Sequence, residues 1–328
     1  MMKVALRYTL LAGLIASSTA MAADKVTYQL DWLPGGDYAP VYVGIQQGYF
    51  AELDLEVSIA SGRGSTDALT KMATGQSDVG TADIGALMAA KGLDNVPVVA
   101  ILPYFTQAPH AFFTLKKSGI SSIQDLKGKK VTTSPFTSSN AFLPLVLQKN
   151  GLSEADIKLV KADAGALGPM MIMGHTDAII AWVTNTALFQ QQAARAGEEI
   201  VEIPWSKQGL SLYSSSLLAS EKFLKERPDV AKRFVKAFAK AIKFTYEYPE
   251  KAGADIHAIV PEVDAKIAAT QIKSITNLVY NEVTKQDGVG TFSAKRIQQT
   301  WEYVATANGL SEDALDLKTV VNYDYAQE

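Results

Sequence analysis

Short apolar runs alternate with amphipathic segments along the first part of the chain. Residues 26–30 (VTYQL), 55–59 (LEVSI) and 96–102 (VPVVAIL) have the apolar, β-branched character of strands. Between them, residues 39–48 and 65–74 carry apolar side chains at helical spacing, and a glycine closes or follows each segment. Strands and helices that alternate at these lengths predict an α/β fold with a parallel sheet covered on both faces.

The same order of elements restarts after about residue 120. Residues 130–133 and 157–161 are predicted strands, and residues 140–148 and 167–173 are predicted helices. A G-x-x-D phrase follows a helix and precedes a strand at Gly75, and it recurs 99 positions later. Glycine and aspartate suit such a turn in any protein. Their recurrence in the same context indicates two similarly built lobes.

The pattern becomes almost wholly helical beyond residue 215. Pro228 opens a helix whose apolar positions share one face, and further helices are expected over residues 262–284 and 293–308. We expect this helical tail to pack back on the first lobe.

The first 22 residues have the three parts of a secretory signal peptide. Lys3 and Arg7 precede an apolar run over residues 10–15, and small residues follow up to Ala22. The apolar run is well short of the ~20 residues that span a bilayer, so an anchor is the weaker alternative. We therefore predict cleavage after Ala22 and export to the periplasm.

Composition narrows the class of partner. The chain has no cysteine, which excludes disulfides, thiolate metal ligands and a lipidated cysteine. Removal of residues 1–22 would leave 328 − 22 = 306 residues, with 31 − 2 = 29 basic against 34 acidic side chains. A mild net charge of −5 points to no polyanionic partner such as nucleic acid. This length predicts about two domains.

Three loops are expected at the carboxyl ends of strands, where open α/β sheets bind ligands near free helix amides. They span residues 31–38, 61–66 and 134–140 and are dense in glycine, hydroxyl and aromatic residues. The loop 61–66 lacks the lysine and the spacing of a P-loop. Helix capping is the alternative role for the hydroxyl groups of the second and third loops.

Aromatic and acidic residues of the first loop suggest the chemistry of the ligand. Trp32 follows a strand end and precedes a Pro-Gly-Gly turn, so we predict that it stacks on a planar ligand, with Tyr38 or Tyr42 on the other side. Asp31, Asp37 and Asp83 would accept hydrogen bonds from ligand amino groups or, alternatively, cap turns. Carboxylates beside an aromatic ring favour a neutral or amino-bearing heterocycle over a bare anion.

In the second lobe, Trp182 and Asn185 follow the second G-x-x-D strand, and they are expected to face the same cleft or to be buried core. The complete set of predicted ligand contacts is Trp32, Gly35, Asp37, Tyr38, Gly64, Ser65, Thr66, Thr81, Asp83, Ser134, Phe136, Thr137, Ser138, Ser139, Trp182 and Asn185.

Several longer motifs together carry a resemblance to a known family. In combination they resemble periplasmic solute-binding proteins of ABC importers, the group that includes binders of thiamine-precursor pyrimidines, of taurine and other alkanesulfonates, and of nitrate. The resemblance covers nearly all of the chain after the signal segment. The motifs are LDWLPGGDYAPVYVGIQQGYF, GRGSTDALTKMATGQSDVGTADI, GISSIQDLKGKKVTTSPFTSS, GHTDAIIAW and RPDVAKRFVKAFAKAIKFTYEYPEKA.

The resemblance implies an α/β, two-lobed type II periplasmic binding protein fold, in which two crossover strands join mixed, mostly parallel sheets flanked by helices. The implied first lobe comprises residues 23–116 and 215–328, and the second comprises residues 117–214. The implied partners are a small-molecule ligand and an ABC permease with its cytoplasmic ATPase. We expect a periplasmic monomer that needs no cofactor, binds no nucleic acid and does not insert into the membrane.

A thiamine-precursor pyrimidine is the first expectation for the ligand, with alkanesulfonate, nitrate, riboflavin-like and aromatic compounds behind it. Gly35 stands where pyrimidine-binding members of the family have a polar residue.

An enzyme is the second functional class to consider, but His110, His175 and His257 lack metal-site or triad spacing, and the cysteine-rich motif of the related eukaryotic pyrimidine synthases is absent. A sensor-kinase-coupled receptor is the third class. We expect no enzymatic activity.

Overall fold

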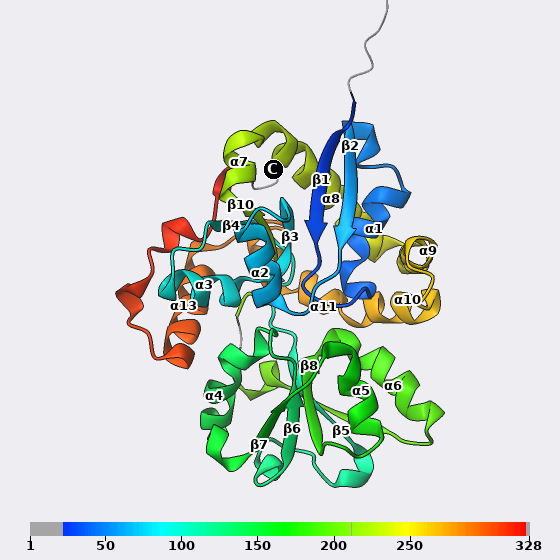
Figure 1. The fold of residues 1–328 in the computed structure, drawn as a ribbon, viewed down its shortest axis with the longest axis vertical. Coiled ribbons are helices and arrows are strands. Elements are labelled where there is room, and N and C mark those ends of the chain that lie inside the picture. Colours follow the sequence, from blue (N-terminus) through cyan, green and yellow to red (C-terminus); the bar gives the residue numbers. More distant parts are fainter. Residues whose placement is uncertain (1–21, 211, 326–328) are drawn as a thin grey trace, which may run out of the picture.

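The computed structural model describes residues 22–210 and 212–325. Figure 1 shows two bodies, one above the other, each built around one five-stranded sheet. We call the body that contains β1 (Asp24–Gln29) the first lobe and the body that contains β6 (Lys130–Thr133) the second lobe. Residues 1–21 of the predicted signal peptide lie outside the described residues.

The first sheet has the strand order β2-β1-β3-β10-β4. β1 pairs in parallel with β2 (Leu55–Ala60) and β3 (Val79–Asp83), as the alternation of strands and helices predicts. β10 (Ser215–Ser220) returns from the second lobe and runs antiparallel between β3 and β4 (Val98–Pro103). The sheet is therefore mixed, and its central strands β3 and β10 are buried along their whole length.

The second sheet repeats this plan with the order β7-β6-β8-β5-β9. β6 is parallel to β7 (Lys158–Lys161) and β8 (Ala178–Trp182), whereas β5 (His110–Leu115) is antiparallel to β8 and β9 (Ile200–Pro204). The predicted boundary at residue 116 assigns β5 to the first lobe, but its ladder with β8 and β9 makes it a strand of the second sheet. The chain thus crosses between the sheets before β5 and again before β10, which moves the first predicted crossing towards the N-terminus.

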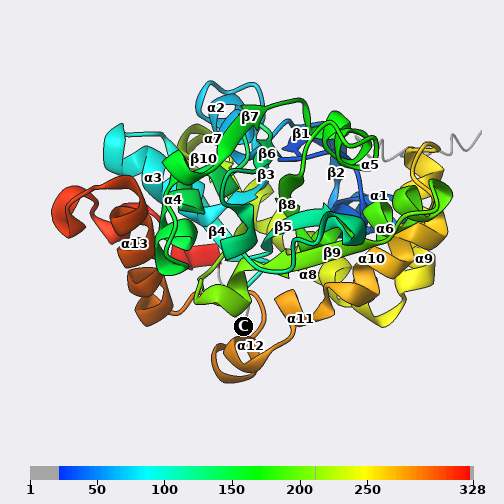
Figure 2. The same cartoon turned by 90° about the horizontal axis from the view of Figure 1, so that it is seen from below.

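Helices cover both sheets (Figures 1 and 2). They are α1 (Ala39–Gln46), α2 (Ser65–Ala73), α3 (Ile84–Leu93), α4 (Ser139–Lys149), α5 (Leu167–Ile172), α6 (Thr186–Arg195), α7 (Glu221–Glu226), α8 (Pro228–Glu247), α9 (Pro249–Ile259), α10 (Ala265–Ser274), α11 (Thr276–Val279), α12 (Glu282–Asp287) and α13 (Ala294–Asn308).

The segment 262–284, predicted to be helical, is divided among α10, α11 and the start of α12. A capping box causes the last division, because the Asn281 side chain accepts from the Val283 amide (3.0 Å) and the Thr284 hydroxyl accepts from the Asn281 amide (2.9 Å). These bonds begin a new helix inside the predicted one.

The helical tail packs on the first lobe through aromatic side chains of α8. Phe234 stacks on Tyr28 of β1 at 6.0 Å and on Phe50 at 4.9 Å between ring centroids. Seen from below (Figure 2), α13 lies beside α3 and α4 on one side, and α10 lies beside α6 on the other. Helices of the tail therefore contact the second lobe as well, on both flanks of the junction between the lobes.

Candidate functional site

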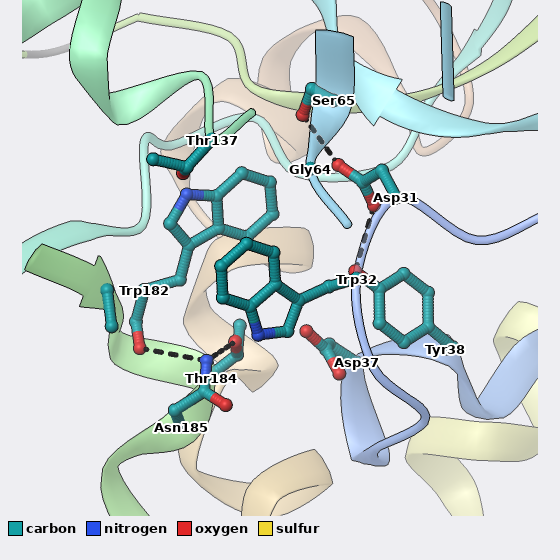
Figure 3. A pocket seen from close by; sticks show the side chains of 11 residues that line it. Asp31, Trp32, Asp37, Tyr38, Gly64, Ser65, Thr137, Trp182, Thr184 and Asn185 are labelled. Atoms are coloured by element: carbon teal, nitrogen blue, oxygen red, sulfur yellow. Dashed lines mark hydrogen bonds between the residues drawn. The ribbon is translucent and has the colours of Figure 1, made fainter. Parts of the chain in front are cut away.

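A pocket with an empty volume of about 300 Å³ lies between the two lobes. Loops at the ends of β1 and β8 and at the starts of α2 and α4 form it (Figure 3). Of its lining residues, eight are among the predicted ligand contacts: Trp32, Asp37, Tyr38, Gly64, Ser65, Thr137, Trp182 and Asn185. Asp31, Ala181 and Thr184 complete the lining. The structure brings the eight together, and their contact with a ligand remains a prediction.

Asp31 begins the wall that the first lobe contributes. Its carboxylate accepts hydrogen bonds from the hydroxyl groups of Tyr38 (2.8 Å) and Ser65 (2.7 Å). The Ser65 hydroxyl in turn accepts from the amide of Asp83 (3.2 Å), at the end of β3. These bonds connect the loop after β1, the first residue of α2 and the end of β3, so three segments of the first lobe hold the wall.

Gln271 of α10 supports the same wall from behind. Its side-chain oxygen accepts a hydrogen bond from the Gly36 amide (2.9 Å), and both residues are buried. A Cβ atom at Gly36 would lie 2.5 Å from the carbonyl oxygen of Ala268, so this close approach of α10 requires glycine. Sequence analysis missed Gln271, because 235 positions separate it from its partner and a lone glutamine in a helix carries no signal.

The two acids of the pocket are buried without a cationic neighbour. Burial raises the pKa of Asp37 to about 7, opposed chiefly by the Thr184 hydroxyl. Burial also raises the pKa of Asp31 to about 6, opposed by the hydroxyl groups of Ser65 and Tyr38. Among the described lining residues there is no lysine, arginine or histidine. A bare anion would therefore find no cationic partner here, whereas a hydrogen-bond donor or a cation would find acceptors.

The second lobe supplies the opposite wall. Trp182 is the last residue of β8 and is buried, and the following turn brings Thr184 and Asn185 to the pocket. Figure 3 shows the indole rings of Trp32 and Trp182 reaching into the pocket from the two lobes. The Asn185 amide donates to the Thr184 hydroxyl (3.3 Å), which orders this turn. A planar ligand between the lobes would meet aromatic surface from both.

Several predicted contacts instead join the lobes to each other. The amide and the hydroxyl of Thr66 both donate to the carbonyl oxygen of Phe136, at 3.2 and 2.9 Å. Gly64, at φ +152°, permits this approach, since a Cβ atom there would lie 2.1 Å from the same oxygen. The Ser134 hydroxyl donates to the carbonyl oxygen of Arg63 (3.2 Å). Thr66, Ser134 and Phe136 do not line the pocket, and the bonded groups of all three hold the two lobes together.

Asp83 also lies outside the pocket lining. It is fully buried, and one carboxylate oxygen accepts from the hydroxyl groups of Ser138 (3.1 Å) and Ser214 (2.7 Å), while the other accepts from the Gly85 amide (2.7 Å). His110 Nε2 stands 3.4 Å from the first oxygen but makes no hydrogen bond of standard geometry. Burial lowers the pKa of His110 to about 4, so the ring is neutral near pH 7. Asp83 and Ser138 thus tie the two lobes near the crossings.

The remaining three predicted contacts are held by other protein groups. Thr81 is buried within β3 and its hydroxyl accepts from Tyr28 (3.3 Å), whereas the Ser139 hydroxyl lies 2.9 Å from His110 Nδ1. Gly35 is buried behind Asp37, whose carboxylate would be 3.0 Å from a Cβ atom at that position. None of the three lines the pocket.

Sequence comparisons identify relatives along most of the chain. The family model described as NMT1/THI5 like matches residues 36–252. A Haemophilus influenzae protein named as a thiamine biosynthesis protein is 28% identical, with 97% of this chain and 98% of that protein covered. The riboflavin-binding protein RibY of Chloroflexus aurantiacus is 24% identical (88% and 82% covered), and the formylaminopyrimidine-binding protein of Halalkalibacterium halodurans is 25% identical (70% and 69%).

Solved structures confirm the predicted fold. A Candida albicans protein described as having the generic periplasmic binding protein fold matches with a TM-score of 0.69 and 18% identity, with 94% of this chain and 98% of that chain covered. The alkanesulfonate-binding protein SsuA of Xanthomonas axonopodis pv. citri, bound to MOPS, matches with a TM-score of 0.68 and 14% identity, with 92% and 96% covered. The architecture is therefore that of a two-lobed α/β periplasmic binding protein.

Enzymes also occur among the relatives. The Saccharomyces cerevisiae protein named 4-amino-5-hydroxymethyl-2-methylpyrimidine phosphate synthase THI13 is 23% identical, with 76% of each chain covered. The structural neighbours are mostly binding proteins, yet the relatives include synthases, so family membership alone does not exclude catalysis.

In residues 22–210 and 212–325, no group of three or more acidic or histidine side chains is placed to hold a metal ion. Across the same residues, no helix combines the length and the apolar character needed to cross a bilayer.

Proposed function

The chain belongs to the NMT1/THI5-like family, and on this premise we propose that it is the substrate-binding component of an ABC importer for a small heteroaromatic molecule of the thiamine-precursor pyrimidine type. One observation carries the proposal: tryptophans of both lobes and two buried acids, without any cationic side chain among the described lining residues, surround one interlobe pocket. Aromatic walls suit a planar ring, and the acids suit its amino groups.

The charges of the pocket favour this ligand over an anion. A sulfonate or nitrate would lie beside Asp31 and Asp37 in a site where desolvation already disfavours negative charge. An amino group attached to an aromatic ring would instead donate to one of these carboxyl groups and form a charge-assisted hydrogen bond with its ionised form. The aminopyrimidine group combines both features in one small ring.

Capture would work by closure of the two lobes. The ligand contacts Trp32 in one lobe and Trp182 in the other only when the lobes approach, so it favours the closed form by its differential affinity. The contact of Thr66 with Phe136, which lies beside the pocket, would form in the same movement. Closure therefore combines burial of the ligand with completion of interlobe hydrogen bonds.

The names of the relatives and the fold support an exported receptor. We place the protein in the periplasm after cleavage behind Ala22, as a monomer that delivers its ligand to a permease with a cytoplasmic ATPase. RibY makes a flavin the second candidate ligand, since an isoalloxazine ring is also planar and carries donors.

A thermal-shift screen tests the ligand class. The protein without residues 1–22 would be heated with 4-amino-5-hydroxymethyl-2-methylpyrimidine, riboflavin, taurine and nitrate. We expect the pyrimidine to raise the melting temperature most, because a ligand that binds only the folded state stabilises it by mass action. A shift with taurine or nitrate alone would refute the proposed ligand class.

A further inference from the structure

Trp182 carries a hydrogen-bond donor that has no partner. Its side chain is 9% exposed, and its indole nitrogen Nε1 is buried without a hydrogen bond. Figure 3 shows this nitrogen on the edge of the ring that faces Thr137, which also lines the pocket. The Thr137 hydroxyl donates to Ser139 (3.3 Å) and accepts no hydrogen bond from this nitrogen. An unpaired buried donor is destabilising and most buried polar side-chain atoms are paired, so this nitrogen, in a residue that lines the pocket, is available to an acceptor on a bound ligand.

The carboxyl groups of the pocket and its unused donor come from different lobes. The first lobe offers acceptors, the carboxyl groups of Asp31 and Asp37, and the second lobe offers the unused donor of Trp182. A ligand whose only polar group is an amino group would pair with the first lobe and leave Trp182 unsatisfied. A ligand that also carries an acceptor would pair with both lobes.

We propose that the Trp182 indole N–H donates a hydrogen bond to a ring nitrogen of the ligand, so that the site selects heterocycles in which an amino group and a ring acceptor lie on different edges. This inference rests on the proposed function and deepens it. Trp182 is then a specificity-determining residue, and its role goes beyond the aromatic surface that it offers. Because its acceptor comes from a ligand bound to the other lobe, the bond also favours closure.

Two probes differ in this acceptor alone. The first is 4-amino-2-methylpyrimidine. The second is 2-amino-6-methylpyridine, which keeps the amino group, the methyl group and the adjacent ring nitrogen but has C–H in place of the other nitrogen. Titration calorimetry at an alkaline pH, where both rings are neutral, should give about 5- to 30-fold tighter binding of the pyrimidine by the wild-type protein.

Two tryptophan variants distinguish a hydrogen bond from Trp182 to the ligand from a purely structural role of its side chain. Trp205 also has a buried indole nitrogen without a partner, but it does not line the pocket. We expect Trp182→Phe to bind both probes within about twofold of each other and Trp205→Phe to keep the wild-type preference, since only the first removes a donor from the site. A purely structural role of Trp182 would weaken both probes equally.

The outcomes distinguish this inference from the proposed function. Equal affinity of the wild-type protein for the two probes, or an unchanged preference in Trp182→Phe, would overturn the assignment of Trp182 while leaving pyrimidine capture intact. Failure of the wild-type protein to bind either probe would overturn the proposed function and this inference with it. The wild-type comparison decides the question even when Trp182→Phe does not fold.

Discussion

The two regions where the lobes meet contain similar residues but differ in how their polar groups are satisfied. At the start of α2, the donors of Thr66 pair with the Phe136 carbonyl, and deeper in the junction Ser138 pairs with Asp83. In the pocket, two acids have no cationic neighbour among the described lining residues, and Trp182 has an unused donor. Thr66 and Ser138 have protein partners, whereas the Trp182 donor has none, so we assign closure of the lobes to the first region and ligand recognition to the second.

We expect the largest loss of ligand affinity when aromatic surface is removed from the pocket. Trp32→Ala should weaken binding of 4-amino-5-hydroxymethyl-2-methylpyrimidine by about 10- to 100-fold, because stacking on an aromatic side chain contributes roughly 1–3 kcal/mol. Leu33→Ala is the control, since Leu33 is the next residue of the same loop, is 43% exposed and does not line the pocket. Calorimetry on both variants measures this affinity, and an unchanged affinity in Trp32→Ala would show that the Trp32 ring does not contact the ligand.

The second-largest effect that we expect is a pH dependence of the free energy of unfolding, which the buried acids cause in the ligand-free protein. The pKa of Asp37 is about 7 in the fold, raised from 3.8, so between about pH 4 and 7 the unfolded chain loses a proton that the folded protein keeps. The free energy of unfolding should therefore fall as pH rises through this window, by at most about 4 kcal/mol from this group, and stay level above it. Asp31 adds a similar slope that ends near pH 6.

Asp37→Asn should flatten this dependence, because the amide does not ionise. Urea denaturation of the ligand-free proteins at pH 5, 6, 7 and 8 measures the slope. If the wild-type protein and Asp37→Asn lost stability equally between pH 5 and 7, Asp37 would not be the buried acid described above.

The smallest effect that we expect is on the rate of ligand release, when a contact between the lobes beside the pocket is weakened. Thr66→Val removes the hydroxyl that bonds to the Phe136 carbonyl across the cleft (2.9 Å). Thr70→Val is a matched control on the same helix, because the exposed Thr70 hydroxyl bonds only to the Thr66 carbonyl (2.8 Å). Stopped-flow measurements should show the ligand leaving Thr66→Val about 2- to 10-fold faster, with Thr70→Val close to the wild type. Equal rates in the two variants would argue against a closing role.

Much of the fold was predictable because local patterns determine it. Strands such as residues 55–59 and 130–133 contain β-branched side chains, and the positive-φ glycines Gly75 and Gly174 end the helices that precede β3 and β8. The division of the segment 262–284 was missed, and its last break is caused by one capping box at Asn281 within an otherwise helical pattern. The pairing of β5 with the second sheet depends on long-range hydrogen bonds that no local pattern reports.

The candidate site was predicted only in part, for a related reason. The sequence identifies loops that reach the cleft, and eight of their residues line the pocket. It does not reveal which partner each polar group meets: Thr66 and Phe136 satisfy each other, and Asp83 is occupied by Ser138. Gln271 supports the pocket from 235 positions away. A serine or aspartate in a loop offers the same chemistry in either role, and only the packing of the two lobes decides between them.

The most direct test of the central claim is a calorimetric competition on the wild-type protein without residues 1–22. The protein would be titrated with 4-amino-5-hydroxymethyl-2-methylpyrimidine, and the titration repeated in saturating taurine. We expect one pyrimidine bound per chain with an affinity that taurine does not change, because the buried acids repel the sulfonate. No heat with the pyrimidine, together with saturable binding of taurine, would contradict it.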